Sequence, residues 1–183
     1  KSRSKFDFEE RIYAAEVILS SLAFLKRDET IQELLAEKEI VDILPKQKVL
    51  SYQSYALLKS KKSMELINIF EKNIKSMTKP IAKEFLFNVA EAFFRKGKYK
   101  KSIQLFDEFL KYYSSSSQSS KASLRIALAY EILDKKIPQT LKLYENTINK
   151  SNIFEDSYEA KLRYVALRSI RKIKPTSLDL EIR

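Results

Sequence analysis

Glycine occurs once in this chain of 183 residues, at position 97, and proline occurs four times. Tight hairpins between strands depend on residues of these kinds, so the chain has few places where a β-hairpin could form. Long stretches of Leu, Lys, Glu, Ala and Ile favour helix over strand. Pro45, Pro80 and Pro138 lie near proposed helix starts, where a missing N–H costs little. The sequence therefore predicts an all-α protein.

Gly97 lies between two apolar patterns of helical period in the segment from Lys83 to Ser116. Small residues in these patterns allow two antiparallel helices to approach closely, and aromatic residues fill the space between this pair and the next. Gly97 supplies the left-handed residue that ends the first helix. We expect the following side chains to be buried at one helix seam: Ala90, Phe93, Ser102, Phe106 and Phe109.

Read as a unit of 34 residues, this segment resembles a tetratricopeptide repeat. The matching residues are Asn88, Val89, Ala90, Ala92, Phe93, Gly97, Tyr99, Ser102, Ile103, Phe106, Phe109 and Leu110. The resemblance implies a right-handed α-solenoid of antiparallel helix pairs. Less regular copies flank the repeat 83–113, at 46–77 and at 120–150. Equivalent second-helix positions fall at Leu66, Ser102 and Thr140, which are 36 and 38 residues apart.

The remaining segments extend this pattern to a single domain over 1–183. Asp7 with Glu10 three residues on is a variant of the capping box and opens a helix to about residue 26. Asp28 opens a second helix to about residue 43, so 7–43 is an N-terminal helix pair. The Ser-rich run 114–120 is interpreted as a solvated connector.

The range 156–173 is interpreted as a C-terminal capping helix. One helical stripe is apolar and consists of Tyr158, Leu162, Val165, Ile170 and Ile173. Arginines lie mostly on the other faces, and Pro175 closes the helix. The expected layout is therefore about nine helices.

Composition excludes most catalytic devices. Without Cys or His the chain has no thiol nucleophile, no imidazole base and no Cys/His zinc site. One glycine cannot build the Gly-rich loops that cradle phosphates. Adjacent acids such as Glu9 and Glu10 point about 100° apart on a helix and cannot flank one bond. We therefore expect no enzymatic activity and no cofactor.

The resemblance places a concave groove along the first helix of each repeat. In the best repeat the groove positions are Glu84, Phe87, Glu91, Phe94 and Arg95. Two exposed aromatics, Phe87 and Phe94, flanked by acids would form a socket for an apolar or basic peptide. The alternative is that both rings are covered by neighbouring helices or by the ends of the chain.

Some members of the family hold the C-terminal carboxylate of a peptide with a clamp of Lys, Asn and Arg. Asn88, Lys121 and Arg125 match positions of that clamp. Ser51 and Tyr55 occupy the places of its first-repeat Lys and Asn, so the clamp is incomplete in this sequence.

The net charge is +11, from 35 cations and 24 acids. Twelve of the cations lie in turns between paired helices: Lys26, Arg27, Lys59, Lys61, Lys62, Arg95, Lys96, Lys98, Lys100, Lys101, Lys135 and Lys136. Stacked repeats would bring these turns together as a basic edge. Cations near helix C-termini also complement the helix dipole, which explains part of the pattern. Five cations within 95–101 repel one another and favour an acidic partner.

The sequence thus indicates an interaction scaffold or adaptor that docks a peptide or a folded protein, most simply one with an acidic surface. The alternative is a basic helical-repeat protein that binds nucleic acid, although RNA-reading arrays use many near-identical repeats. An anionic membrane surface is a further alternative. The longest apolar run, 12–25, is interrupted and too short to span a bilayer. The chain begins at Lys1 without Met, so cytoplasm fits, as does a bacterial periplasm or envelope after removal of a leader or anchor.

Overall fold

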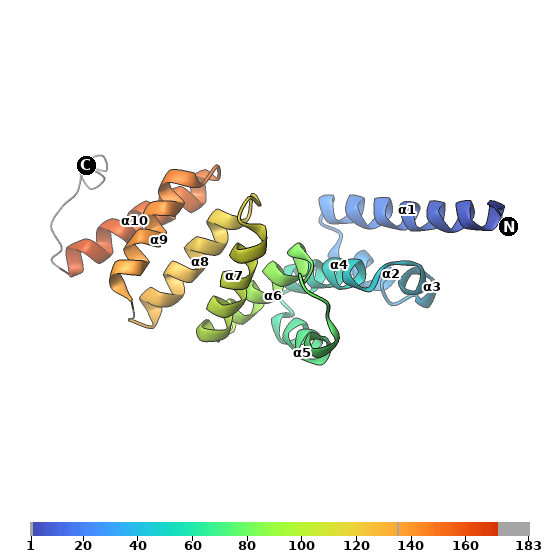
Figure 1. Cartoon of the computed structure of the whole chain (residues 1–183), viewed down its shortest axis with the longest axis horizontal. Coiled ribbons are helices and arrows are strands. Elements are labelled where there is room, and N and C mark those ends of the chain that lie inside the picture. The colour runs from blue at the N-terminus through green and yellow to red at the C-terminus, as the bar shows by residue number, and fades with distance from the viewer. Residues whose placement is uncertain (1, 135, 172–183) are drawn as a thin grey trace. The chain divides into compact units, whose positions relative to one another are not determined.

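The computed structural model describes the backbone of residues 2–134 and 136–171, and the side chains of 7–134 and 136–171 (Figure 1). Within these residues the protein is all-α, without strands, and its helices pack in adjacent pairs as in a helical-repeat architecture. The elements are α1 (Ser2–Phe24), α2 (Asp28–Leu34), α3 (Lys38–Ile43), α4 (Lys46–Lys59), α5 (Ser63–Asn73), the short 3-10 helix η1 (Ile74–Ser76), α6 (Lys83–Arg95), α7 (Tyr99–Tyr113), α8 (Ser119–Ile132), α9 (Ile137–Lys150) and α10 (Phe154–Ile170). The expectation of an all-α fold is confirmed.

The chain divides into two compact units, Lys1–Gly97 and Lys98–Arg183. The boundary falls inside the repeat 83–113, directly after the glycine. The right-handedness of the array and its unity as one domain stay predictions.

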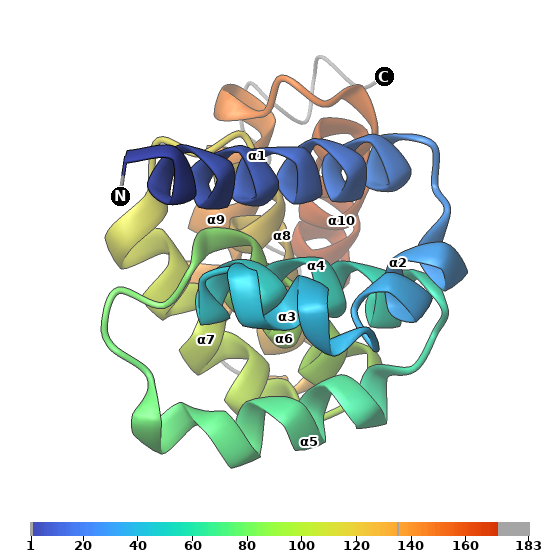
Figure 2. The same cartoon turned by 90° about the vertical axis from the view of Figure 1, so that its right-hand side faces the viewer.

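In the first unit, α4 packs against α1, α5 and α6. Figure 2 shows α4 between α1 and α5. The first helices of successive pairs are joined by hydrogen bonds between residues about one repeat apart. Tyr55 donates to the Ala23 carbonyl over 32 residues at 2.8 Å, and Asn88 donates to Ser54 Oγ over 34 residues at 3.0 Å. These separations are close to the 34-residue period of the family that the sequence resembles.

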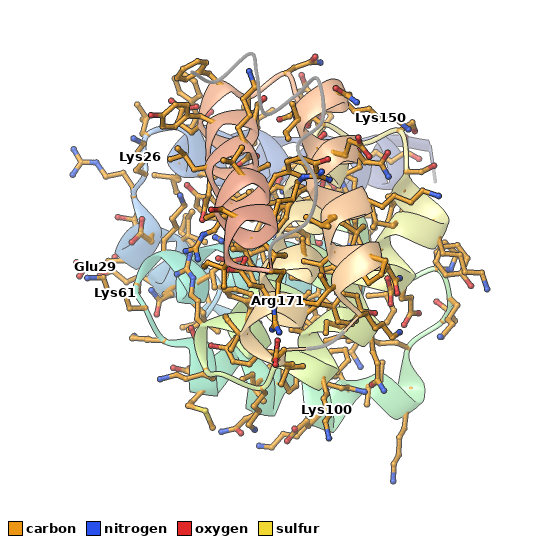
Figure 3. The ribbon with its side chains drawn as sticks, turned by 90° about the vertical axis from the view of Figure 1, so that its left-hand side faces the viewer. Lys26, Glu29, Lys61, Lys100, Lys150 and Arg171 are labelled. Atoms are coloured by element: carbon orange, nitrogen blue, oxygen red, sulfur yellow. The ribbon has the colours of Figure 1, made fainter. Side chains whose placement is uncertain are left out.

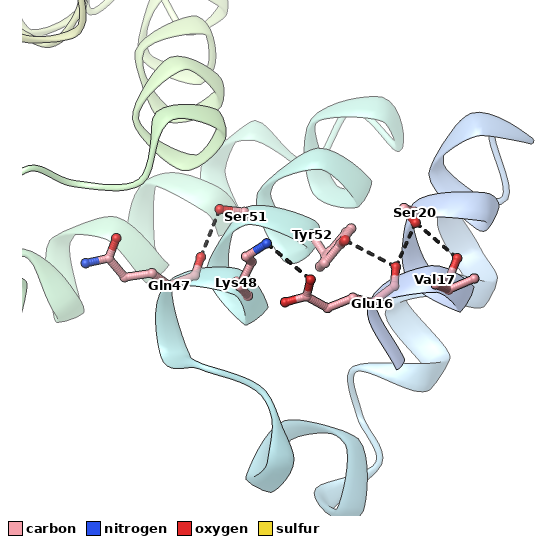
Figure 4. Close-up of polar contacts among 7 residues, drawn as sticks. All are labelled: Glu16, Val17, Ser20, Gln47, Lys48, Ser51 and Tyr52. Carbon is pink, nitrogen blue, oxygen red and sulfur yellow. Dashed lines mark hydrogen bonds and ion pairs between the residues drawn. The ribbon is translucent and has the colours of Figure 1, made fainter. Parts of the chain in front are cut away.

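The contact between α1 and α4 has a small polar network at its centre (Figure 4). Lys48 Nζ lies 3.3 Å from Glu16 Oε2, and the Tyr52 hydroxyl donates to the Glu16 carbonyl at 3.4 Å. Ser20 Oγ donates to the same carbonyl at 2.7 Å. Burial raises the pKa of Tyr52, and nearby Lys48 partly offsets this effect. The network fixes which face of α1 lies on α4.

One predicted helix, 28–43, is two short helices, α2 and α3, with a break at 35–37. At about 100° per residue, a continuous helix would turn Ile40 about 180° away from the fully buried Ile31. In the structure Ile40 and Ile43 both pack against the core cluster that contains Ile31. The break therefore returns the second half of the segment to the core. The extra helix also accounts for ten α-helices among the described residues, where about nine were expected for the chain.

The second unit stacks α7, α8, α9 and α10 in chain order. Its largest fully buried side chains include Phe106, Phe109, Leu124 and Tyr144. Arg163 Nη1 donates to Glu131 Oε1 at 3.3 Å over 32 residues, so α8 and α10 are related much as α1 and α4 are in the first unit.

All five predicted seam residues are buried: Ala90, Phe93, Ser102, Phe106 and Phe109. Their burial is confirmed. Since they belong to both units, their meeting at one seam stays a prediction.

The apolar stripe noted in 156–173 is not the face that α10 buries, and the capping role stays a prediction. The predicted stripe points outward: Tyr158, Leu162 and Ile170 are exposed. α10 instead buries the face with Ala160, Tyr164 and Leu167, which places small and apolar atoms against α9. Both stripes recur at helical spacing, so periodicity alone did not decide between them. Ile173 and Pro175 lie outside the described residues.

The first helix of each pair ends at a residue with left-handed backbone. These residues are Lys26 (φ 56°), Lys61 (φ 59°), Gly97 (φ 70°) and Asp134 (φ 51°). In the first two turns the N–H groups of this residue and of the next donate back to the helix, as in a Schellman motif. The spacings are 35, 36 and 37 residues, so this backbone feature marks the repeat more regularly than any residue type.

Lys61→Gly is expected to raise the free energy of unfolding by about 0.5–1 kcal/mol, because a left-handed backbone strains every L-residue with a Cβ. The reverse change, Gly97→Ala, should lower it by about 1 kcal/mol. A Cβ at Gly97 would meet nothing within 4 Å, so only the backbone conformation is penalised there. Urea unfolding followed by circular dichroism measures both changes, and equal stability of K61G and the parent would contradict the assigned turn.

Candidate functional site: a basic edge on the first unit

Three turns of the first unit lie together at the ends of α1, α4 and α6. Gln32 Nε2 donates to Ser60 Oγ at 3.0 Å, and Ser60 Oγ lies 3.4 Å from Asp28 Oδ2. These bonds join the turn after α1 to the turn after α4. Arg95 Nη1, at the end of α6, donates to the Leu58 carbonyl at 3.0 Å. The three helix ends therefore form one continuous edge.

This edge is rich in exposed cations. We define the basic edge as Lys26, Arg27, Lys59, Lys61, Lys62, Arg95 and Lys96, all of which are exposed. Figure 3 shows Lys26, Glu29 and Lys61 along the same side of the molecule, with Glu29 near Lys61. The gathering of basic turns that the sequence predicted is thus present within the first unit.

Some cations of the basic edge have partners within the protein. Lys62 Nζ donates to Gln32 Oε1 at 2.9 Å, and Lys59 Nζ lies 5.6 Å from the centre of the Tyr55 ring. Arg95 pairs with the buried Glu91 at 3.2 Å. Within the described residues, the remaining four cations make no ion pair: Lys26, Arg27, Lys61 and Lys96. Their charges are available to a partner.

Acids are few on this edge. Glu91 is buried beneath Arg95, Asp28 contacts Ser60, and Glu29 is exposed. Glu65, exposed in the first turn of α5, is a further acid beside these turns.

The hydroxyl of Tyr55 donates to the Ala23 carbonyl. Burial and, to a smaller extent, the charge of Asp28 raise the pKa of this hydroxyl. Tyr55 thus stays neutral and holds α4 to α1.

The expectation that Phe87 is exposed in an aromatic socket is not met, and partner binding by this residue stays a prediction. This side chain is 5% exposed, while Phe94 is half-buried, so the alternative of a covered ring holds for Phe87. The reason is that α6 is buried on every side from Phe85 to Phe93. A helix buried all round leaves no open face for a peptide. Glu84 is exposed and lies 3.2 Å from Lys83 Nζ.

The residues that match a carboxylate clamp are divided between the two units. Asn88 donates its amide to the buried Ser54, so it joins α6 to α4. Ser51 Oγ donates to the Gln47 carbonyl at 2.8 Å. Lys121 and Arg125 are half-buried on α8 in the second unit. Ligand binding by Asn88, Lys121 and Arg125 stays a prediction.

The cations Lys98, Lys100 and Lys101 are exposed at the start of α7. The unit boundary separates them from Arg95 and Lys96. Their continuity with the basic edge therefore stays a prediction.

A hollow of about 410 Å³ in the second unit is lined by the serine run and α9. Seven of its lining residues are serines, with Asn146, Lys150 and Asn152 beside them. It holds no pair of acids and no base suited to catalysis. Among the described residues no cluster of three carboxylates could hold a metal ion.

No protein-family model matches the chain, and comparison with curated proteins gives no match. Within the part of the chain that the structure describes, no helix has both the length and the apolar character needed to cross a membrane.

Proposed function

We propose that this chain is a non-enzymatic interaction module, similar to tetratricopeptide scaffolds, that docks an acidic surface of a partner protein. The observation that carries the proposal is the basic edge, where three helix ends meet and four cations have no ion pair within the described residues. Complementary charge on a partner would relieve the mutual repulsion of these cations and speed association.

The backbone of the turns supports the same proposal. Lys26 and Lys61 occupy left-handed positions at which glycine is less strained. Gly97 shows that the chain uses glycine at an equivalent turn. Lysine at the other two such positions of the first unit adds charge to the edge at a cost in stability. Local strain of this kind is concentrated at functional sites in proteins.

A protein partner fits the edge better than nucleic acid does. Glu29 is exposed near Lys61. The phosphate backbone of a nucleic acid carries no cation that could pair with Glu29, whereas a protein surface of mixed charge carries such cations. Single-stranded nucleic acid also needs aromatic platforms for its bases, and the hydroxyl of the half-buried Tyr55 is already used within the protein.

The test compares two triple charge reversals. The edge variant carries K61E, K62E and K96E. The control carries K46E at the start of α4, K72E at the end of α5 and K75E in η1, which are remote from the turn between these two helices. Each set lowers the net charge by six, from +11 to +5. Any difference between the variants therefore reports the position of the charges.

The probe is a fluorescein-labelled peptide rich in Glu, Asp and Leu, followed by fluorescence anisotropy, with length-matched single-stranded RNA as the competing class. We expect the edge variant to bind the peptide at least about tenfold more weakly and with a flatter salt dependence, and the control to bind within about threefold of the parent. Equal weakening in both variants would contradict a localised site. Tighter binding of RNA than of peptide by the parent would favour the nucleic-acid alternative. Charge reversal of Lys98, Lys100 and Lys101 to Glu in the same assay shows whether the second unit contributes to peptide binding.

A further inference from the structure

The break between α2 and α3 forms part of a small hollow in the first unit, which we call the side hollow. Its volume is about 170 Å³. Three apolar and three polar side chains from α2, the break, α4 and α5 line it: Gln32, Leu35, Ala36, Gln53, Leu57 and Glu65. Leu35 and Ala36 belong to the break itself. The break that returns the chain to the core therefore also builds one wall of the side hollow.

The size of the side hollow limits what it can hold. Pockets for drug-sized ligands and cofactors measure about 300–1,000 Å³. Cavities of about 150 Å³ hold one apolar group of the size of benzene. The side hollow, at about 170 Å³, therefore fits a single side chain. Such a side chain belongs to a chain segment that lies across the surface, which makes the occupant a peptide or a protein.

Charge in and around the side hollow is balanced. Glu65 is the only charged residue in the lining. Lys62 Nζ donates to Gln32 Oε1 at 2.9 Å, which places a cation beside the hollow. Two acids and two cations, all exposed, lie within two residues of the lining in the sequence: Glu33, Glu37, Lys38 and Lys59. Because neither sign is in excess and half of the lining is apolar, the side hollow favours an uncharged apolar side chain.

Gln53 supplies a hydrogen-bonding group for the backbone of the occupant. This residue lines the side hollow, is half-buried, and its side chain makes no hydrogen bond within the described residues. A glutamine amide donates from its nitrogen and accepts at its oxygen, which matches the N–H and C=O groups beside a peptide side chain. The amide of Gln32 is already used, since its nitrogen donates to Ser60 Oγ and its oxygen accepts from Lys62.

The side hollow adjoins the basic edge. Gln32 lines the hollow and bonds to Ser60 and Lys62, which belong to the turn after α4. We propose that the side hollow binds one apolar side chain of leucine size from the acidic segment that docks on the basic edge. This inference rests on the proposed function and specifies its partner: an apolar anchor residue with carboxylates beside it, for which Lys61 and Lys62 are the nearest cations of the edge.

Two acidic peptides of equal length and charge test the proposal by fluorescence anisotropy on the 183-residue chain. One carries a single central Leu, and the other carries Ser in its place. We expect the Leu peptide to bind at least about tenfold more tightly, because burial of a leucine side chain is favourable by at least about this factor. Equal, salt-dependent binding of both peptides would overturn this inference and leave the proposed function standing. A third peptide with Lys at the central position should bind more weakly than the Leu peptide, and tighter binding would overturn the inference in favour of a cationic occupant.

Ala36→Trp tests the location of the anchor site. Tryptophan at this exposed position fills the side hollow without changing the charge of the chain. A36W should bind the Leu and Ser peptides within about threefold of each other, at the affinity of the parent for the Ser peptide. The control is Ala14→Trp, at an exposed position of α1 outside the hollow, which should keep the preference for Leu. The K61E, K62E and K96E variant should bind both peptides weakly, since its defect lies in charge. Circular dichroism checks that A36W keeps its helix content, and a folded A36W that still prefers the Leu peptide tenfold would overturn the proposal.

Discussion

Phe106→Ala is expected to lower the free energy of unfolding by about 3–5 kcal/mol. Phe106 lies on α7 and is fully buried, so truncation to Ala removes most of a ring and leaves a cavity that the neighbouring helices fill only in part. Chemical denaturation followed by circular dichroism measures the change.

Tyr112→Ala on the same helix is the control, because Tyr112 is exposed. It should change the free energy of unfolding by less than about 1 kcal/mol. Equal effects of F106A and Y112A would contradict the assigned inner face of α7.

Ser54→Leu is expected to lower the free energy of unfolding by about 2–5 kcal/mol. Ser54 is fully buried on α4, and its Oγ accepts the amide of Asn88 on α6. Leucine would force the two helices apart and leave the Asn88 amide without this acceptor. Ser54→Ala removes the hydrogen bond without adding volume, and should cost only about 1–2 kcal/mol.

The exposed Asn68→Leu on α5 is the control and should be nearly neutral. Thermal unfolding of the three variants separates the two causes, because only S54L adds volume at a buried position. If S54L were no less stable than S54A, close packing of α4 on α6 would be refuted.

The helical fold was predictable because few residues in this chain interrupt a helix and the apolar spacing is close to 3.6 residues. The break between α2 and α3 was not predictable from local propensity, since it depends on where the core of the first unit lies relative to Ile40. The buried face of α10 was missed for a related reason. That helix has two stripes of core-like residues, and contact with α9 decides between them.

The basic edge was partly predictable. Cations in the turns are visible in the sequence, and the structure joins three of these turns. Lysines in the left-handed positions were missed because propensity assigns such positions to glycine. The available signal was the spacing of 35, 36 and 37 residues from Lys26 through Lys61 and Gly97 to Asp134. The burial of Phe87 depends on the whole environment of α6 and left no local signal.

The most direct test of the central claim is a two-dimensional NMR titration of the isotope-labelled 183-residue chain with the acidic peptide. We expect the largest amide shift changes in three segments, 25–29, 59–63 and 95–97, which are the turns of the basic edge. The same segments should stay unperturbed in the K61E, K62E and K96E variant. Shift changes centred on other helices, or equal changes in parent and variant, would contradict the assignment of partner binding to the basic edge.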